Sequence, residues 1–251
     1  QYCMSRKIQK WFVKTLLAVL VIFTTLLFIN ASDDRVARAI LQMAIGLIIF
    51  WVFVGGFLMY HFRERIRGFV LGLPGHWRTK FIIFTILLAL TEEAIAVSMT
   101  NLAPFFGVQK GEAFITASTN YFDVVFFHSV IIFVPLFIAT ASLLARYQFS
   151  AFSLFVIFGI VGTVCEALYA GNVAMILAAY QWIFVYGLMV YLPVYTLPKD
   201  RGAIPPRWWN YIFAPVQIFI RALPLLILIF LTIVVVFRHP FLENFRHFLL
   251  Y

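Results

Sequence analysis

Residues 81–100 read FIIFTILLALTEEAIAVSMT, a predominantly apolar run interrupted by the adjacent pair Glu92 and Glu93. A helix rises about 1.5 Å per residue, so roughly 20 apolar residues cross a hydrocarbon core about 30 Å thick. The segment therefore predicts a transmembrane helix that carries two carboxyl groups inside the membrane.

Similar apolar runs fill the chain on both sides of this segment. We predict seven spans, at residues 11–29, 39–60, 81–100, 121–144, 149–170, 173–192 and 223–237. Arg221 interrupts the last apolar region, and a charge at mid-membrane costs about 3 kcal/mol on insertion scales. We therefore expect residues 208–221 to lie at the membrane interface and to lead into a short final span.

The composition agrees with a membrane protein. Of 251 residues, 64% are hydrophobic and 12% charged, whereas soluble domains carry roughly 25% charged residues. No polar stretch is long enough for a separate soluble domain, which excludes an extramembrane catalytic domain. The sequence predicts an all-α, polytopic helix bundle in which residues 1–251 form a single integral membrane domain.

The net charge of +9 comes from short basic clusters between the apolar runs. Lys and Arg concentrate in alternate connections, which by the positive-inside rule places the N-terminus inside and the C-terminus outside a cytoplasmic (inner or plasma) membrane. The same clusters predict contact with anionic lipid of the inner surface and no nucleic-acid partner. The predicted headgroup-binding residues are Arg63, Arg65, Arg67, Arg78 and Lys80.

Ionisable groups inside spans are costly and are functional candidates by default. Counting residues from the predicted span ends places the candidates in the outer half of the membrane. They are Glu92, Glu93, Asp123, His128 and Glu166. For Asp123, a helix N-cap role is an equally good interpretation, as it is for Asn120.

Small residues recur at helical spacing around two of these glutamates. Ala89, Ala96 and Thr100 accompany Glu93, and Gly159, Gly162, Thr163 and Ala170 accompany Glu166. Membrane helices approach each other closely along such stripes. We therefore expect both carboxyl groups to face the bundle interior and to share a water-filled pocket, with the loop 101–120 folding over it as a lid.

Adjacent carboxylates cannot both ionise cheaply in a low dielectric, so a proton or a divalent cation is expected at the site. A carboxyl group that alternates between neutral and charged forms suits a proton-coupled carrier. A glutamate beside His128 would instead activate water for hydrolysis.

The order of Glu92, Glu93 and, one span later, His128 resembles the glutamate-type intramembrane proteases related to CAAX prenyl proteases. The resemblance implies a membrane-embedded hydrolase. Three positions depart from the motifs of that family: Val97 replaces an arginine, Val124 a phenylalanine and Glu166 a histidine.

The leading hypothesis is a cation- or proton-coupled transporter of a small solute. One alternative is a membrane-embedded hydrolase that acts on a lipid-like substrate or a membrane peptide through Glu93 and His128. The other is a non-catalytic subunit that binds partner membrane subunits.

Overall fold

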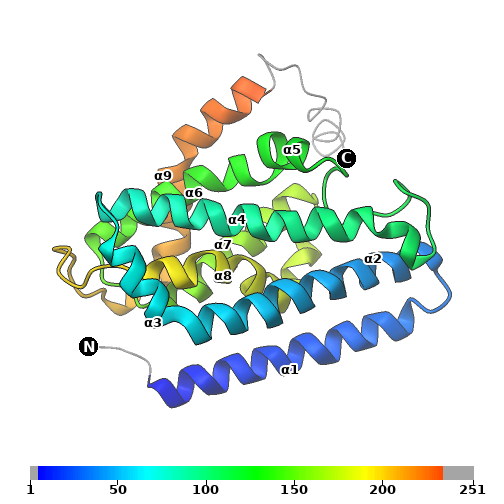
Figure 1. Ribbon diagram of the computed structural model, residues 1–251, viewed down its shortest axis with the longest axis horizontal. Helices are drawn as coiled ribbons and strands as arrows, with labels where there is room; N and C mark the ends of the chain where they lie inside the picture. Colours follow the sequence, from blue (N-terminus) through cyan, green and yellow to red (C-terminus); the bar gives the residue numbers. More distant parts are fainter. Residues whose placement is uncertain (1–4, 234–251) are drawn as a thin grey trace.

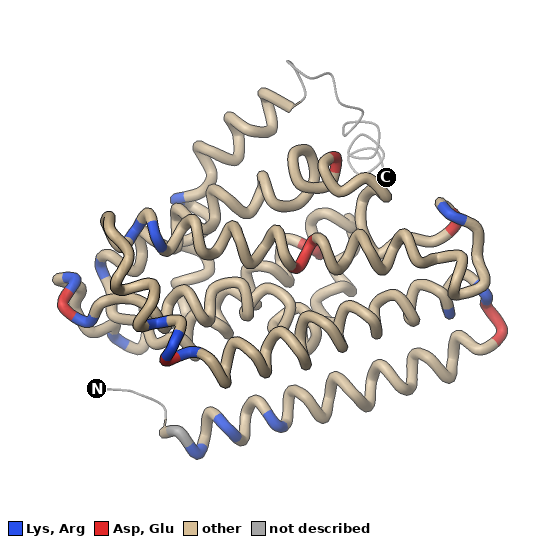
Figure 2. Tube along the Cα trace, viewed as in Figure 1, with Lys and Arg blue, Asp and Glu red and all other residues tan. Residues whose placement is uncertain are grey.

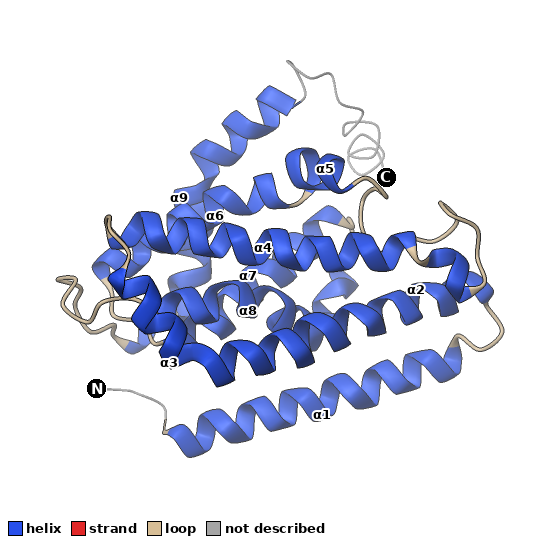
Figure 3. Cartoon of the chain, viewed as in Figure 1, coloured by secondary structure: helices blue, strands red, loops and turns tan. Residues whose placement is uncertain are grey.

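The computed structural model describes residues 5–233, in which helices follow one another through short connections (Figures 1 and 3). The elements are α1 (Arg6–Asn30), α2 (Arg35–Leu47), η1 (Ile48–Gly55), α3 (Gly56–Gly72), α4 (Trp77–Asn101), η2 (Ala103–Phe106), α5 (Tyr121–Asp123), η3 (Val124–His128), α6 (Val130–Arg146), α7 (Ala151–Tyr169), η4 (Val173–Ala178), α8 (Ala179–Tyr195) and α9 (Trp208–Leu231). In this part of the chain, β-pairing is limited to an isolated bridge between Tyr147 and Ile204. The all-α prediction is confirmed.

Within residues 5–233, six helices are long and apolar enough to cross a membrane, and a bent pair makes up to seven spans. The six are Lys7–Asn30, Arg35–Gly72, Trp77–Asn101, Ala151–Tyr169, Val173–Tyr195 and Trp208–Leu231. In the bent pair, Tyr121–His128 and Val130–Arg146 meet at 47°. Each of the seven predicted regions therefore coincides with a helical span, although their ends differ.

The second span extends well beyond the predicted end at residue 60. Its helix continues over 38 residues, from Arg35 to Gly72. Residues 61–72 include three arginines and a glutamate, which favour helix, and the first proline of this region is Pro74. Most of residues 61–80, the basic region that we expected to connect the second and third spans, is thus helical.

The expected boundary at Arg221 is wrong, because α9 runs through it without a break. The Arg221 guanidinium donates a hydrogen bond to Ser142 Oγ on α6 at 2.5 Å, so a neighbouring helix satisfies its polarity. Helix α9 crosses the direction shared by α1, α2 and α4 obliquely (Figure 1). Residues 234–237 of the predicted last span lie outside the described residues.

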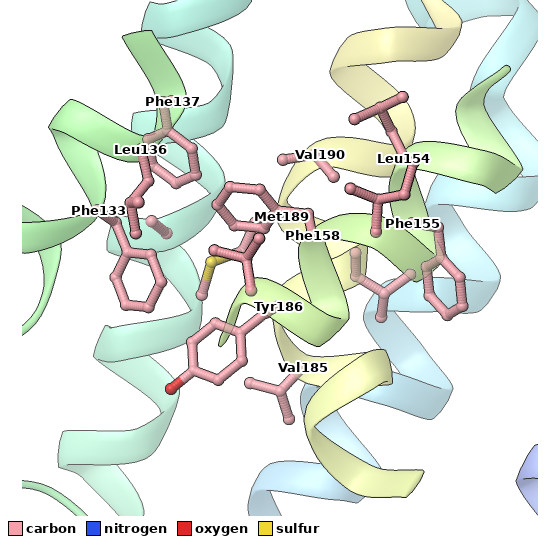
Figure 4. Packing of buried hydrophobic residues seen from close by; sticks show 14 of the residues in the cluster. Phe133, Leu136, Phe137, Leu154, Phe155, Phe158, Val185, Tyr186, Met189 and Val190 are labelled. Atoms are coloured by element: carbon pink, nitrogen blue, oxygen red, sulfur yellow. The ribbon is translucent and has the colours of Figure 1, made fainter. Parts of the chain in front are cut away.

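The most extensive helix pairing is that of α7 with α8, and an aromatic cluster joins this pair to α6. In Figure 4, Phe133 and Phe137 from α6 face Phe158 from α7 and Met189 from α8, and the Phe137 and Phe158 ring centroids are 5.4 Å apart. A Cβ atom added at Gly159 would lie 2.5 Å from Ile183 Cα, which shows how closely α7 approaches α8. Glycine is needed here because the two backbones touch.

Charged residues gather at the two ends of the bundle, and acidic residues near its middle are the exception (Figure 2). Basic residues crowd the end that holds the α3–α4 turn. The positive-inside rule predicts that this end faces the cytoplasm. We call it the inner end and the opposite one the outer end.

Candidate functional site

Glu92 and Glu93 lie in the second half of α4, and each exposes only 6% of its surface. The small residues at helical spacing, Ala89, Ala96 and Thr100, are also buried. Small side chains let the neighbouring helices approach α4 on this face. The glutamates therefore point into the bundle and not toward lipid.

Glu93 accepts a hydrogen bond from the hydroxyl of Ser129, with Ser129 Oγ 2.6 Å from Glu93 Oε2. Ser129 lies at the break in the bent span, where its backbone (φ −111°, ψ −80°) leaves the helical region. The π-helix η3 ends just before it and α6 begins just after it. The interruption thus brings a polar donor and the first turn of α6 to a buried carboxyl group.

Glu166, near the end of α7, accepts a hydrogen bond from the Tyr186 hydroxyl of α8. A Cβ atom at Gly162 would lie 2.1 Å from the Tyr186 ring, so this ring position requires glycine. The other face of the phenol stacks on Phe133, with centroids 4.9 Å apart. Figure 4 shows the Tyr186 hydroxyl pointing out of this apolar cluster.

The three glutamates lie close enough to interact electrostatically. Glu92 interacts with both Glu93 and Glu166, and the Tyr186 hydroxyl interacts with all three. We call Glu92, Glu93 and Glu166 the acidic cluster. Within the described residues, Glu92 makes no hydrogen bond, and the ion pairs involve other groups, Arg35 with Glu112 and His128 with Asp123. Among the described residues, no lysine or arginine pairs with the cluster to balance its charge.

His128 and Asp123 form a separate pair, with Nε2 and Oδ2 3.6 Å apart. The π-helical hydrogen bonding of η3 connects residues five apart, which brings the two side chains to one face. Asn120 is the N-cap, since its side chain accepts from the backbone N–H groups of Phe122 and Asp123. The N-cap interpretation is confirmed for Asn120 and not for Asp123.

No group of three or more His, Cys, Asp or Glu side chains within residues 5–233 is arranged to hold a metal ion. The contacts found in the acidic cluster are with hydroxyl groups. Ser129 and Tyr186 each donate a hydrogen bond to one of its carboxyl groups.

The loop between α4 and α5 packs onto the outer end of α4. The Thr100 and Thr116 hydroxyls are 2.9 Å apart, and Asn101 Nδ2 donates to the Thr119 carbonyl at 2.9 Å. Two cavities lie at opposite ends of the bundle, and neither is lined by the acidic cluster. The loop is therefore bonded to the outer end of α4 in this conformation.

Several predicted headgroup residues also have partners within the protein. Lys80 donates to the Val70 carbonyl at 3.1 Å and to the Leu73 carbonyl, near the end of α3. The Arg63 guanidinium lies 4.0 Å from the Tyr60 ring centroid. Lys80 thereby joins the start of α4 to the end of α3, whereas the contact of Arg63 with Tyr60 lies within α3.

Ser129 and Tyr186 are the residues that the sequence analysis missed. Both are hydroxyl-bearing side chains inside predicted spans, surrounded by apolar residues. A buried hydroxyl needs a hydrogen-bond partner, so each is a signal that a polar group lies on an adjacent helix.

No protein-family model matches the chain, and neither a curated protein nor a solved structure resembles it significantly.

Proposed function

We propose that this protein is a proton-coupled transporter of a small solute and that its acidic cluster carries the coupling proton. The observation that carries the proposal is the convergence of three carboxyl groups from α4 and α7, with no basic partner among the described residues. Such intramembrane carboxyl groups commonly form proton relays in pumps and transporters.

Charge balance supports a proton as the coupling ion. Three neighbouring carboxylates, of which Glu92 and Glu93 are buried and Glu166 is partly buried, repel one another in a low dielectric. A proton neutralises one of them without needing space or a set of ligands. The hydroxyl donors Ser129 and Tyr186 then stabilise the carboxyl groups that remain charged.

The broken span supports a conformational step. Discontinuous membrane helices often form the substrate and ion sites of transporters. Here the 47° bend falls at Ser129, the residue that donates to Glu93. Protonation of Glu93 changes what that hydroxyl bonds to, and so couples proton binding to the angle between the two halves of the span.

The hydrolase alternative has weaker support in the geometry. It requires Glu93 and His128 to act on one water molecule. The contacts instead join Glu93 to Ser129, and His128 to Asp123. The transporter proposal uses the observed contacts as they are.

Uptake into proteoliposomes tests the proposal. Radiolabelled amino acids, monocarboxylates, sugars and organic cations are offered with and without an imposed proton gradient. We expect at least one solute to accumulate faster with the gradient and the Glu93→Gln protein to lose this acceleration. The matched control is Asp200→Asn, which removes a carboxyl group from an exposed connection.

An acceleration that persists in folded Glu93→Gln, Glu92→Gln and Glu166→Gln proteins would contradict the proposal. Gel filtration and thermal unfolding in detergent identify variants that fail to fold. The glutamine side chain keeps the shape of glutamate, which limits such failures.

A further inference from the structure

A cavity of about 460 Å³ opens at the outer end of the bundle, within the range of roughly 300–1,000 Å³ typical of small-molecule sites. It lies between the α1–α2 turn, the start of α2 and η2. The residues that matter for its chemistry are Asp33, Arg35, Arg38, Gln42, Phe105 and Phe106. We call this cavity the outer pocket.

Arg38 supplies the outer pocket with a positive charge that forms no ion pair with the described residues. Arg35 binds the Glu112 carboxylate, whereas Arg38 has its guanidinium 5.4 Å from the Phe28 ring centroid. One turn further along α2, the half-buried amide of Gln42 makes no hydrogen bond within the described part of the chain. Arg38 and Gln42 together present donors to an anionic group.

Asp33 supplies the same pocket with a negative charge that forms no ion pair with the described residues. The Asp33 carboxylate accepts from the Ser32 hydroxyl at 3.3 Å. Asp33 and Arg38 thus line one cavity without bonding to each other. Opposite charges that face a common space and remain separate are complementary to a ligand that carries both charges.

Apolar surface completes the outer pocket. Phe105 lines the pocket and exposes 84% of its surface. Phe106 is partly buried and lines the pocket from the same short helix, η2. These rings can cover a hydrocarbon group of the ligand.

We propose that the outer pocket binds a small zwitterion with an apolar substituent, Arg38 holding its carboxylate or phosphate and Asp33 its ammonium group. Two sources supply this chemistry: an amino acid in solution and the ethanolamine headgroup of a phospholipid. An amino acid bound in the outer pocket would be the solute of the proposed transporter. Its transport after binding rests on the proposed function, whereas the binding itself does not.

Binding by the purified full-length protein tests the inference without relying on transport. The soluble probe is L-phenylalanine, measured by calorimetry in detergent. N-acetylphenylalanine lacks the ammonium charge, and phenylalanine methyl ester lacks the carboxylate. We expect both analogues to bind at least about tenfold more weakly, because each loses one charge-assisted interaction.

The lipid arm uses delipidated protein with phosphatidylethanolamine or phosphatidylglycerol added back and counted by native mass spectrometry. If the headgroup is the ligand, phosphatidylethanolamine is retained in preference and phenylalanine does not bind. If an amino acid is the ligand, phenylalanine binds and the two lipids are retained equally.

Variants connect either result to the outer pocket. Arg38→Gln and Asp33→Asn should each weaken the preferred probe at least about tenfold. Lys110→Gln and Asp200→Asn remove the same charges from exposed positions outside the pocket and should bind as the unaltered protein does.

The inference is overturned if neither phenylalanine nor phosphatidylethanolamine is preferred, or if folded Arg38→Gln and Asp33→Asn proteins bind the preferred probe unchanged. Glu93→Gln separates this outcome from the proposed function. It should bind the probe normally and lose only gradient-driven uptake.

Discussion

At the scale of single residues, the acidic cluster depends on two hydroxyl groups. Each hydroxyl belongs to a helix other than that of its carboxyl partner: Ser129 donates to α4, and Tyr186 donates to α7. A hydrogen bond to a charged group contributes roughly 1.5–3 kcal/mol, more than a neutral one. The two hydrogen bonds therefore connect neighbouring helices and also fix the positions of the two carboxyl groups.

Removing the Tyr186 hydroxyl tests this directly. Tyr186→Phe keeps the ring against Gly162 and Phe133 but leaves the Glu166 carboxyl without its donor. We expect a loss of about 1–3 kcal/mol in the free energy of unfolding, measured by steric trapping in bicelles. Tyr180→Phe, on the same helix, is the control. Equal stabilities for the two variants would contradict the assigned role of the Tyr186 hydroxyl.

Glu112 in the outer loop predicts a pH dependence. The backbone N–H of Gln109 donates to its carboxylate at 2.8 Å and Arg35 pairs with it, which lowers the pKa of Glu112 below its usual value of 4.5. A lowered pKa in the folded state stabilises the protein above the unfolded-state pKa, and this stabilisation disappears as the pH falls through the folded-state pKa.

The measurement is the unfolding temperature of the unaltered protein and Glu112→Gln from about pH 7 to about pH 3. The unaltered protein should be the more stable at neutral pH, and the two curves should converge in acid. A difference that is constant with pH would show that ionisation of Glu112 plays no part.

At the scale of elements, the close pairing of α7 and α8 depends on glycine. Gly159 and Gly162 on α7 and Gly187 on α8 each have atoms of the other helix where a Cβ would lie, at 2.1–2.5 Å. Contacts this short leave no room for adjustment by a side chain alone. The two helices form one unit, and the Glu166–Tyr186 bond lies inside it.

Gly162→Ala should push α7 and α8 apart. The new methyl group meets the Tyr186 ring at 2.1 Å, and overpacking of this kind typically costs about 1–3 kcal/mol. Gly68→Ala in α3 is the matched control, because nothing lies within 4 Å of its Cβ position, and it should stabilise the helix by about 0.5–1 kcal/mol. Steric trapping compares the two; similar effects would refute the close-packing explanation.

The elements also show what the sequence could predict. Apolar length identified all seven regions, because the bilayer imposes it on every span. The break at Ser129 left no such signal, since its flanking residues are as apolar as those of an unbroken span. The continuity of α9 was missed because Arg221 is satisfied by Ser142, a residue 79 positions away.

For the candidate site, the small-residue stripe indicated the buried face of Glu93. Around Glu166 the structure buries Gly159, Gly162 and Thr163, while Glu166 is partly buried and Ala170 is exposed. The partners Ser129 and Tyr186 depend on how helices are rotated against each other. Periodicity within one helix does not contain that information. The pairing of His128 with Asp123 depends on the local π-helix, which the sequence pattern did not reveal.

At the scale of the whole molecule, the distribution of charge predicts how the bundle sits in the membrane. Basic residues crowd the end with the α3–α4 turn, where half-buried Arg201 donates to the carbonyls of Leu144 and Pro198. Burial lowers the pKa of Arg201. The opposite end carries the outer pocket and the Arg35–Glu112 pair.

Cysteine labelling tests this orientation in cells. With Cys3 and Cys165 replaced by serine, Lys110→Cys should react with a membrane-impermeant maleimide added outside. Lys199→Cys should react only after the cells are opened. The reverse pattern would invert the assignment of the two ends, and with it the side from which the outer pocket is reached.

The helix from Arg35 to Gly72 measures about 57 Å at 1.5 Å per residue, nearly twice the thickness of the hydrocarbon core. Arg38 lies near one tip and Arg63 toward the other, while the Trp51 indole between them is bonded to the Val185 carbonyl of α8 at 2.9 Å. This hydrogen bond anchors the helix to α8 near its middle. If a ligand bound in the outer pocket tilts the helix about this point, we expect its inner end to move in the opposite direction.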